Sequence, residues 1–195
     1  MCLEPHDEAG VCLARKDIAK VLPGKTLRPD TLTITRQLGC MNTTPDELWM
    51  EEALQQAQLA LQVGEVPVGA VLVCEGRIVG RGFNRNRLDS DPTAHAEIVA
   101  LRQGAATLGN HRLLDCELYV TIEPCAMCAG AMVHARLRRL IYAADDPKAG
   151  AVHSVLQVLN NPKLNHQMTV TSGVLAERAS EMLQAFFRSK RQKGE

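Results

Sequence analysis

The sequence has neither an excess of charge of one sign nor a long apolar segment, and both absences limit the classes of function that the protein can have. Its 22 Lys and Arg residues equal its 22 Asp and Glu residues. No overall basic field therefore marks a nucleic-acid-binding protein, and any such binding must depend on a local patch. No apolar run is long enough to cross a membrane, and the N-terminus lacks the basic-then-apolar layout of a secretory signal. We therefore expect a soluble, cytoplasmic protein.

The chain also lacks a disulfide framework. It has seven cysteines, an odd number, and two of them belong to the metal-ligand motif described below. The others show no pairing pattern, which favours reduced thiols in a cytosol. With 195 residues, 46% of them hydrophobic, the chain can form one compact domain with a substantial core.

Residues 1–44 differ from the rest of the chain. They scatter Pro and Gly, for example Pro5 and Gly24, and show no sustained helical or strand period. We expect a flexible N-terminal extension at 1–44 and a single folded domain at 45–195. Two other interpretations stay open: translation upstream of a natural start at Met41, or a short regulatory arm.

From residue 45 onward, helix and strand patterns alternate. Thr44, Pro45 and Glu47 predict a capped helix start, and Asp91 followed by Pro92 predicts another. This order favours an α/β fold around one sheet. The expected helices cover about 45–63, 92–108, 124–135 and 175–190, and the expected strands cover 68–74, 77–82, 118–122, 140–143 and 168–171.

Two short motifs indicate the chemistry. His95 and Glu97 form H-x-E, and Cys125 and Cys128 complete P-C-x-x-C 30 positions later. Together they supply three zinc ligands and one carboxylate that is not a ligand. Structural zinc sites usually have four protein ligands, whereas catalytic sites keep one position for water. The combined pattern is typical of zinc deaminases that act on nucleobases.

Other interpretations of these residues are weaker. A redox C-x-x-C pair would not need His95 or Glu97. A structural zinc site would need a fourth ligand, for which His111, His134 and His153 are the nearby histidine candidates.

The expected mechanism follows from these charges. Zinc lowers the pKa of its water from roughly 15.7 towards neutrality. Glu97 can accept the water proton, deliver it to a ring nitrogen and later protonate the departing amine. Attack on a carbon that carries an exocyclic amine releases ammonia, so the reaction class is hydrolytic deamination. The alternative for Glu97 is a surface glutamate in the first helical turn.

Four longer runs carry a family resemblance: GEVPVGAVLV at 64–73, DPTAHAEIVALRQG at 91–104, LYVTIEPCAMCAGAMVHARL at 118–137 and FFRSKRQ at 186–192. Over roughly 49–191, the chain resembles bacterial tRNA-specific adenosine deaminases of the cytidine deaminase-like superfamily. The resemblance implies a three-layer α-β-α sandwich with one central mixed sheet of about five strands. It also implies a homodimer with one Zn²⁺ per subunit that converts adenosine to inosine at the wobble position of a tRNA anticodon, with the base splayed out from the loop.

The resemblance assigns roles residue by residue. His95, Cys125 and Cys128 match the zinc ligands, and Glu97 matches the proton shuttle. The family's substrate contacts fall on Asn84 (a hydrogen bond to the base), on Val66, Pro67 and Val68 (the apolar wall of the base pocket), on Asp146 (near the ribose) and on Lys148 (a phosphate contact). Without the resemblance, these residues would be interpreted as a strand-end turn, core positions and solvated loop charges.

The C-terminal segment forms a local basic, partly aromatic strip, which suits single-stranded RNA. The strip comprises Phe186, Phe187, Arg188, Lys190, Arg191 and Lys193. The simpler interpretation is an amphipathic helix with core phenylalanines and a solvated basic face. The chain departs from the family at Asp145, where the related pattern often has a basic residue, and this departure leaves the details of RNA contact open.

Two other functions use the same features. A deaminase of free bases or nucleotides, acting on guanine, cytidine or deoxycytidylate, would share the zinc chemistry in a more closed pocket. Asn84 and the basic strip speak against it. A non-catalytic RNA-binding accessory subunit would keep the zinc but would not need Glu97.

Overall fold

The computed structural model describes residues 43–193, so the expected extension at 1–44 lies almost entirely outside the described residues. Within this range no helix is both long and apolar enough to cross a membrane. The elements are α1 (Pro45–Gln62), β1 (Gly69–Cys74), β2 (Arg77–Phe83), α2 (Asn86–Asp89), α3 (Ala96–Leu108), β3 (Cys116–Ile122), α4 (Ala126–Ala135), β4 (Arg139–Ala144), β5 (Thr169–Ser172) and α5 (Ala176–Lys193). All the expected helices and strands are present; the short helix α2 was not predicted.

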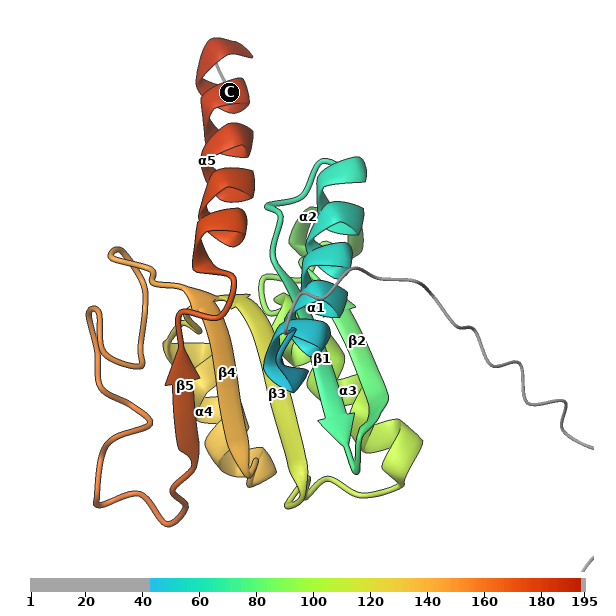
Figure 1. Cartoon of the computed structure of the whole chain (residues 1–195), viewed down its shortest axis with the longest axis vertical. Coiled ribbons are helices and arrows are strands. Elements are labelled where there is room, and N and C mark those ends of the chain that lie inside the picture. Colours follow the sequence, from blue (N-terminus) through green and yellow to red (C-terminus); the bar gives the residue numbers. More distant parts are fainter. Residues whose placement is uncertain (1–42, 194–195) are drawn as a thin grey trace, which may run out of the picture. The chain divides into compact units, whose positions relative to one another are not determined.

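The strands form one mixed sheet in the order β2-β1-β3-β4-β5 (Figure 1). β1 is antiparallel to both β2 and β3, whereas β3, β4 and β5 run parallel. The helices α3 and α4 cover one face of this sheet, and α1 covers the other, with the first turns of α5 beside it. This arrangement confirms the predicted three-layer α-β-α sandwich.

Alternation along the strands builds a core on each face of the sheet. In β1, Ala70 and Leu72 pack with the buried residues of α3 and α4, while Val71 and Val73 pack with those of α1. Neighbouring side chains of a strand point to opposite faces, so one short apolar run serves both cores. The uninterrupted burial of β1 follows from helices on both sides.

The helix starts confirm one predicted cap and correct two predicted boundaries. At α1, the Glu47 N–H donates to Thr44 Oγ1 over 3.3 Å and the Thr44 N–H donates to Glu47 Oε2 over 2.6 Å, the expected capping box. At α3, the predicted start at Asp91 and Pro92 is wrong, because Asp91 Oδ1 instead accepts both the N–H and the hydroxyl of Thr93 in a turn.

The corrected boundaries place the metal-ligand candidates at the very ends of two helices. α3 begins at Ala96, so His95, with extended backbone at φ −72° and ψ 153°, is its N-cap. α4 begins at Ala126, later than predicted, and Cys125 is its N-cap. An N-cap residue can turn its side chain away from the helix while its neighbours' free N–H groups stay nearby.

A glycine sets how closely α3 approaches the sheet. A Cβ atom at Gly82 in β2 would collide with the Ala96 carbonyl oxygen and the Ala100 nitrogen of α3. The absence of a side chain at Gly82 therefore lets the first turn of α3 lie directly on the end of β2.

Strand direction brings the predicted site residues to one edge of the sheet. β2, β3 and β4 end at this edge, and β1, which runs the opposite way, begins there; Gly69 pairs with Phe83, and Ile122 pairs with Ala144. Ligands of open α/β sheets bind outside the carboxyl ends of the strands. Segments distant in sequence therefore meet at this edge.

Candidate active site

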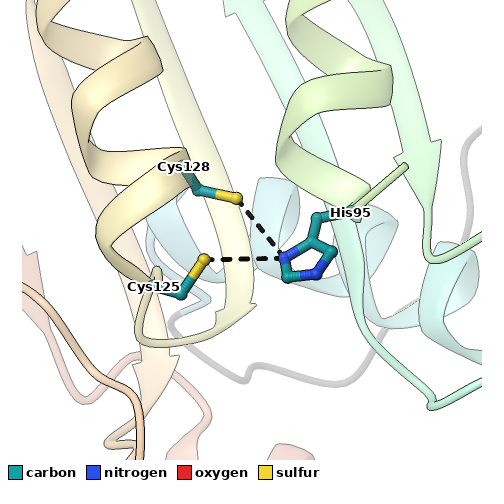
Figure 2. Close-up of side chains that lie close together, drawn as sticks. All are labelled: His95, Cys125 and Cys128. Carbon is teal, nitrogen blue, oxygen red and sulfur yellow. Dashed lines mark hydrogen bonds between the residues drawn. The ribbon is translucent and has the colours of Figure 1, made fainter. Parts of the chain in front are cut away.

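His95, Cys125 and Cys128 lie together between the starts of α3 and α4. His95 Nδ1 lies 3.6 Å from the sulfur of Cys125 and 3.6 Å from that of Cys128, and Figure 2 shows the three side chains turned towards one another. Their candidate ligand atoms all lie within 4.8 Å of one another. The structure thus gathers the three predicted ligand residues into one group that could hold a metal ion.

The charges within this group suit a metal ion. Hydrogen bonds from the Cys128 thiol and from His95 lower the pKa of Cys125 to about 3, which makes it a thiolate at neutral pH. The bond to Cys125 raises the pKa of His95, against the opposing effect of burial. The hydrogen bond to Cys125, together with burial, raises the pKa of Cys128. One thiolate beside an imidazole is a ready donor set, and metal binding releases the remaining thiol proton.

The donor set fits zinc with an open position. Two sulfurs and one imidazole nitrogen are common zinc ligands, and three protein ligands are typical of catalytic sites. Within the described residues, His111, His134 and His153 do not belong to this group. The fourth ligand of a structural site is therefore not supplied by the histidines that the sequence suggested.

Glu97, the second residue of α3, lies beside this group. Its side chain is 2% exposed and lines the cavity described below. Burial raises the pKa of this carboxyl group, and the Cys128 thiol is close enough to bond it. A carboxyl group with a raised pKa can both accept and donate a proton near neutral pH, as general acid–base catalysis requires. The alternative of a surface glutamate does not fit this burial.

A cavity of about 860 Å³ opens over the group. Most of the predicted site residues line it, but Pro67, Cys128 and Lys190 do not: Pro67 and Cys128 are buried, and the Lys190 ammonium lies 5.8 Å from the centre of the Phe186 ring. The predicted residues in the lining are Val66, Val68, Asn84, His95, Glu97, Cys125, Asp146, Lys148, Phe187, Arg188 and Arg191.

Asn84 has a second task that the sequence did not reveal. Its side chain is buried, and its Oδ1 accepts a hydrogen bond from the Ala96 N–H over 2.9 Å. That N–H is one of the groups that the first turn of a helix leaves without an internal partner. With the oxygen engaged, the amide NH₂ is the part of Asn84 that remains to contact a bound molecule.

The wall formed by α5 shows a helical face that sequence reasoning found only in part. Ser180, Leu183 and Gln184 line the cavity together with Phe187, Arg188 and Arg191. Their spacing of three and four residues places them on one side of the helix. Extending this spacing backward from Phe187 would have found the first three residues.

The sequence left open whether the two phenylalanines of α5 belong to the core or contact a ligand, and the structure gives a different answer for each. Phe186 is 8% exposed and belongs to the buried hydrophobic residues, whereas Phe187 is 46% exposed and lines the cavity. Their rings meet edge to face with centroids 5.4 Å apart. The amphipathic-helix interpretation thus holds for Phe186, while Phe187 keeps a face for a ligand.

Further lining residues follow the strand ends. They were missed because they precede or follow the motif residues without a recognisable spacing of their own. This set comprises Asn86, Ile122, Glu123, Ala144, Asp145, Pro147 and Ala149.

Comparisons with known proteins show which family the chain resembles. The profile of the MafB19-like deaminase family matches residues 44–191. The tRNA-specific adenosine deaminase of Haemophilus influenzae is 52% identical over 148 residues, which cover 75% of this chain and 86% of that protein. A structure solved in work on A-to-I editing by tRNA:A34 deaminases at the wobble position of transfer RNA has a TM-score of 0.68 and 47% identity, covering 70% of this chain and 99% of that one. A guanine deaminase from Nitrosomonas europaea has a TM-score of 0.63 and 27% identity, over 72% of this chain and 83% of that one.

Proposed function

The chain belongs to the tRNA-specific adenosine deaminases, and from this we propose that it hydrolyses adenosine to inosine at the wobble position of a tRNA anticodon, releasing ammonia. The observation that carries the proposal is the group of His95, Cys125 and Cys128 beside the buried Glu97, open to a cavity with basic and aromatic side chains at its α5 wall.

The roles of the site residues follow from their chemistry. We propose that His95, Cys125 and Cys128 would hold one Zn²⁺ per subunit, which when bound would lower the pKa of a water molecule. Glu97 would take a proton from the attacking water and give it to a ring nitrogen. It would then take the hydroxyl proton of the tetrahedral carbon, as this becomes a carbonyl, and give it to the amine, which leaves as ammonia. Its burial supports this cycle, because a raised pKa brings its two protonation states closer in energy at neutral pH.

Binding of the base involves the walls of the cavity. The NH₂ group of Asn84 donates to the flipped base, and Val66 and Val68 contact its apolar face. Pro67 supports this wall from its buried position between them. A base splayed out of a loop is commonly read by hydrogen bonds and by apolar contacts of this kind.

Binding of the RNA backbone involves the rim. We assign phosphate contacts to Lys148, Arg188 and Arg191, and a stacking contact to Phe187. Lys190 acts as a more distant positive charge on α5, and Asp146 lies near the ribose. The local character of this rim explains how a chain of zero net charge can bind RNA.

Three further properties belong to the same proposal. The deaminase domain comprises residues 45–195, supported by the family profile that begins at residue 44. The enzyme works as a homodimer, as its family resemblance implies. It acts in the cytoplasm, where a tRNA substrate and reduced thiols coexist.

Deamination of a free base such as guanine is the competing function, favoured by the likeness to the Nitrosomonas europaea enzyme. A cavity of about 860 Å³ whose walls carry Arg188 and Arg191 suits a substrate larger than one base. The higher identity to the tRNA enzymes supports the same conclusion.

The test is deamination by zinc-loaded protein of an anticodon stem-loop with adenosine at the wobble position, with guanine and free nucleosides alongside. We expect inosine in the RNA and a loss of roughly 10² to 10⁴ in rate for Glu97→Gln. Glu117→Gln, the same change on β3 outside the cavity lining, is the matched control. Activity on guanine alone would move the assignment to the free-base enzyme, and zinc binding without any activity would favour an accessory subunit.

A further inference from the structure

Glu123 is a buried carboxylate at the cavity that the deamination mechanism does not use. It follows β3 and precedes Pro124 and Cys125, and its side chain is 0% exposed. Charged side chains are almost never fully buried without partners, because removing a charge from water is costly. Its partners therefore indicate its task.

Within residues 43–193, the donors to the Glu123 side chain all come from one loop, residues 145–155 after β4, which we call the β4 loop. Glu123 Oε1 accepts from the backbone N–H groups of Val152, His153 and Ser154 at 2.9, 2.9 and 3.1 Å. Glu123 Oε2 accepts from the N–H of Asp146 at 3.1 Å and from the Ser154 hydroxyl.

These hydrogen bonds occupy the acceptor positions of the Glu123 carboxylate. Two carboxylate oxygens offer about four lone-pair positions, and five donors already converge on them. Although Glu123 lines the cavity and lies near Asp145 and His153, it has no acceptor capacity left for a substrate or a metal ion. Any effect of Glu123 on the reaction must therefore act through the β4 loop.

The β4 loop carries one wall of the cavity. Asp145, Asp146, Pro147, Lys148 and Ala149 all line it. The tip of the loop is a rigid turn, because Asp146 Oδ1 accepts the N–H groups of Lys148 and Ala149 at 2.9 and 3.2 Å, and the Asp146 carbonyl accepts the N–H of Gly150 at 2.9 Å. Because these bonds tie the turn together, the contacts that anchor it determine where the backbone of Lys148 lies.

The β4 loop is attached to segment 123–125, which includes the metal-ligand candidate Cys125. The Ala151 N–H donates to the Pro124 carbonyl over 2.8 Å, Gly150 forms an isolated bridge with Cys125, and the Glu123 N–H donates to the Ala144 carbonyl over 2.7 Å. Segment 123–125 thus holds both the substrate wall and one ligand of the metal group.

Gly150 shows how close this fit is. A Cβ atom there would collide with the carboxylate of Glu123 and crowd the Asp146 carbonyl. A glycine is therefore required by the approach of the loop to the carboxylate.

We propose that Glu123 is a positioning residue for the deamination. Its carboxylate fixes the β4 loop to segment 123–125, and this places Asp146 and Lys148 where they contact the RNA while the target base lies beside the metal-ligand group. This inference rests on the proposed function. Without the carboxylate, four backbone N–H groups of the loop lose their acceptor, and the wall shifts relative to Cys125.

The test separates positioning from folding and from metal binding. Glu123→Gln keeps the size of the side chain but replaces one acceptor oxygen by an NH₂ group that faces N–H donors. Gly150→Ala keeps the carboxylate and displaces the loop from it. For both zinc-loaded variants we expect KM for the stem-loop to rise roughly tenfold or more, the effect of losing a hydrogen bond to a charged group, with a smaller change in kcat.

Three measurements complete the design. In Glu123→Gln and Gly150→Ala we expect zinc content at the wild-type level and faster hydrogen exchange of the backbone amides of residues 146–154. Ser154→Ala, which removes one of the five donors to Glu123, should change KM by a smaller factor. Glu117→Gln, on the strand β3 that precedes Glu123 but outside the cavity lining, leaves KM and kcat unchanged. If Glu123→Gln fails to fold, Gly150→Ala still has to show the change in KM.

Two outcomes overturn the proposal: a wild-type KM in Gly150→Ala with the loop released, or a loss of kcat alone that follows a loss of zinc. If the wild-type protein does not deaminate the stem-loop, the proposed function fails instead. Hydrogen exchange at 146–154 in the variants still reports whether Glu123 holds the loop.

Discussion

Asn84 provides the sharpest test of how the site is built, because its two amide atoms have separable tasks. Its oxygen accepts the Ala96 N–H at the start of α3. Its NH₂ group is the part that we propose to contact the substrate. Asn84→Ala removes both groups, whereas Asn84→Asp keeps an acceptor oxygen and removes the donor. The two variants therefore predict different combinations of stability and activity.

The expected magnitudes follow from burial. In Asn84→Ala the buried Ala96 N–H loses its partner, which costs about 1–3 kcal/mol. For a domain of this size, the midpoint of thermal unfolding then falls by about 3–10 °C. In Asn84→Asp, a carboxylate at a helix N-terminus gains stabilisation while its burial opposes it, so we expect stability within about 1 kcal/mol of wild type.

Activity, unlike stability, should fall in both variants. Both lose the NH₂ donor, so kcat/KM for the stem-loop falls roughly tenfold to a hundredfold in each. The assay combines thermal unfolding at saturating zinc with steady-state deamination. Asn110→Ala is the control, because Asn110 makes a similar bond to the Arg112 N–H in an exposed loop, and it should change stability by less than about 0.5 kcal/mol. A wild-type midpoint for Asn84→Ala, or wild-type activity for Asn84→Asp, would refute this division of tasks.

The remaining predictions concern the metal, the proton balance and the RNA. Removing zinc with a chelator should abolish deamination and lower the unfolding midpoint, and Zn²⁺ but not Mg²⁺ should restore both, because sulfur ligands disfavour Mg²⁺. Although burial opposes it, hydrogen bonds from Ser154 and the backbone lower the pKa of Glu123 from its usual 4.5 to about 2. The stabilisation that this carboxylate contributes is complete above about pH 4.5 and is lost as the pH falls towards 2. In acid titrations the free energy of unfolding of the wild-type protein should therefore fall by up to about 3 kcal/mol more than that of Glu123→Gln. Equal losses in the two proteins would contradict the assignment. Arg188→Ala should raise KM for the stem-loop. It should also reduce the slope of log affinity against log salt concentration by about 0.7 for each phosphate that is no longer neutralised. The control Arg178→Ala, which breaks an ion pair with Glu51 outside the cavity lining, should leave this slope unchanged.

Local patterns made much of the fold predictable. The capping box at Thr44 and Glu47 lies within a few residues of the helix start that it defines, so the sequence alone located it. The start of α3 was misplaced because Asp91 and Pro92 resemble a helix cap, while the decisive contact comes from Asn84, 12 positions earlier.

The sequence by itself determined which residues gather at the metal group. H-x-E and P-C-x-x-C specify the candidate ligand types through spacing alone, and the structure brings His95, Cys125 and Cys128 together as predicted. Ligand chemistry depends on residue type, which is written directly in the chain.

Only the tertiary structure decided what holds these residues in place. The donors to Glu123 lie 23 to 31 positions along the chain, and the lining face of α5 meets the other walls only when the sheet is assembled. Such contacts depend on strand order and direction rather than on any local pattern. The sequence thus names the reacting groups, while the packing around the sheet edge sets their distances and their pKa values.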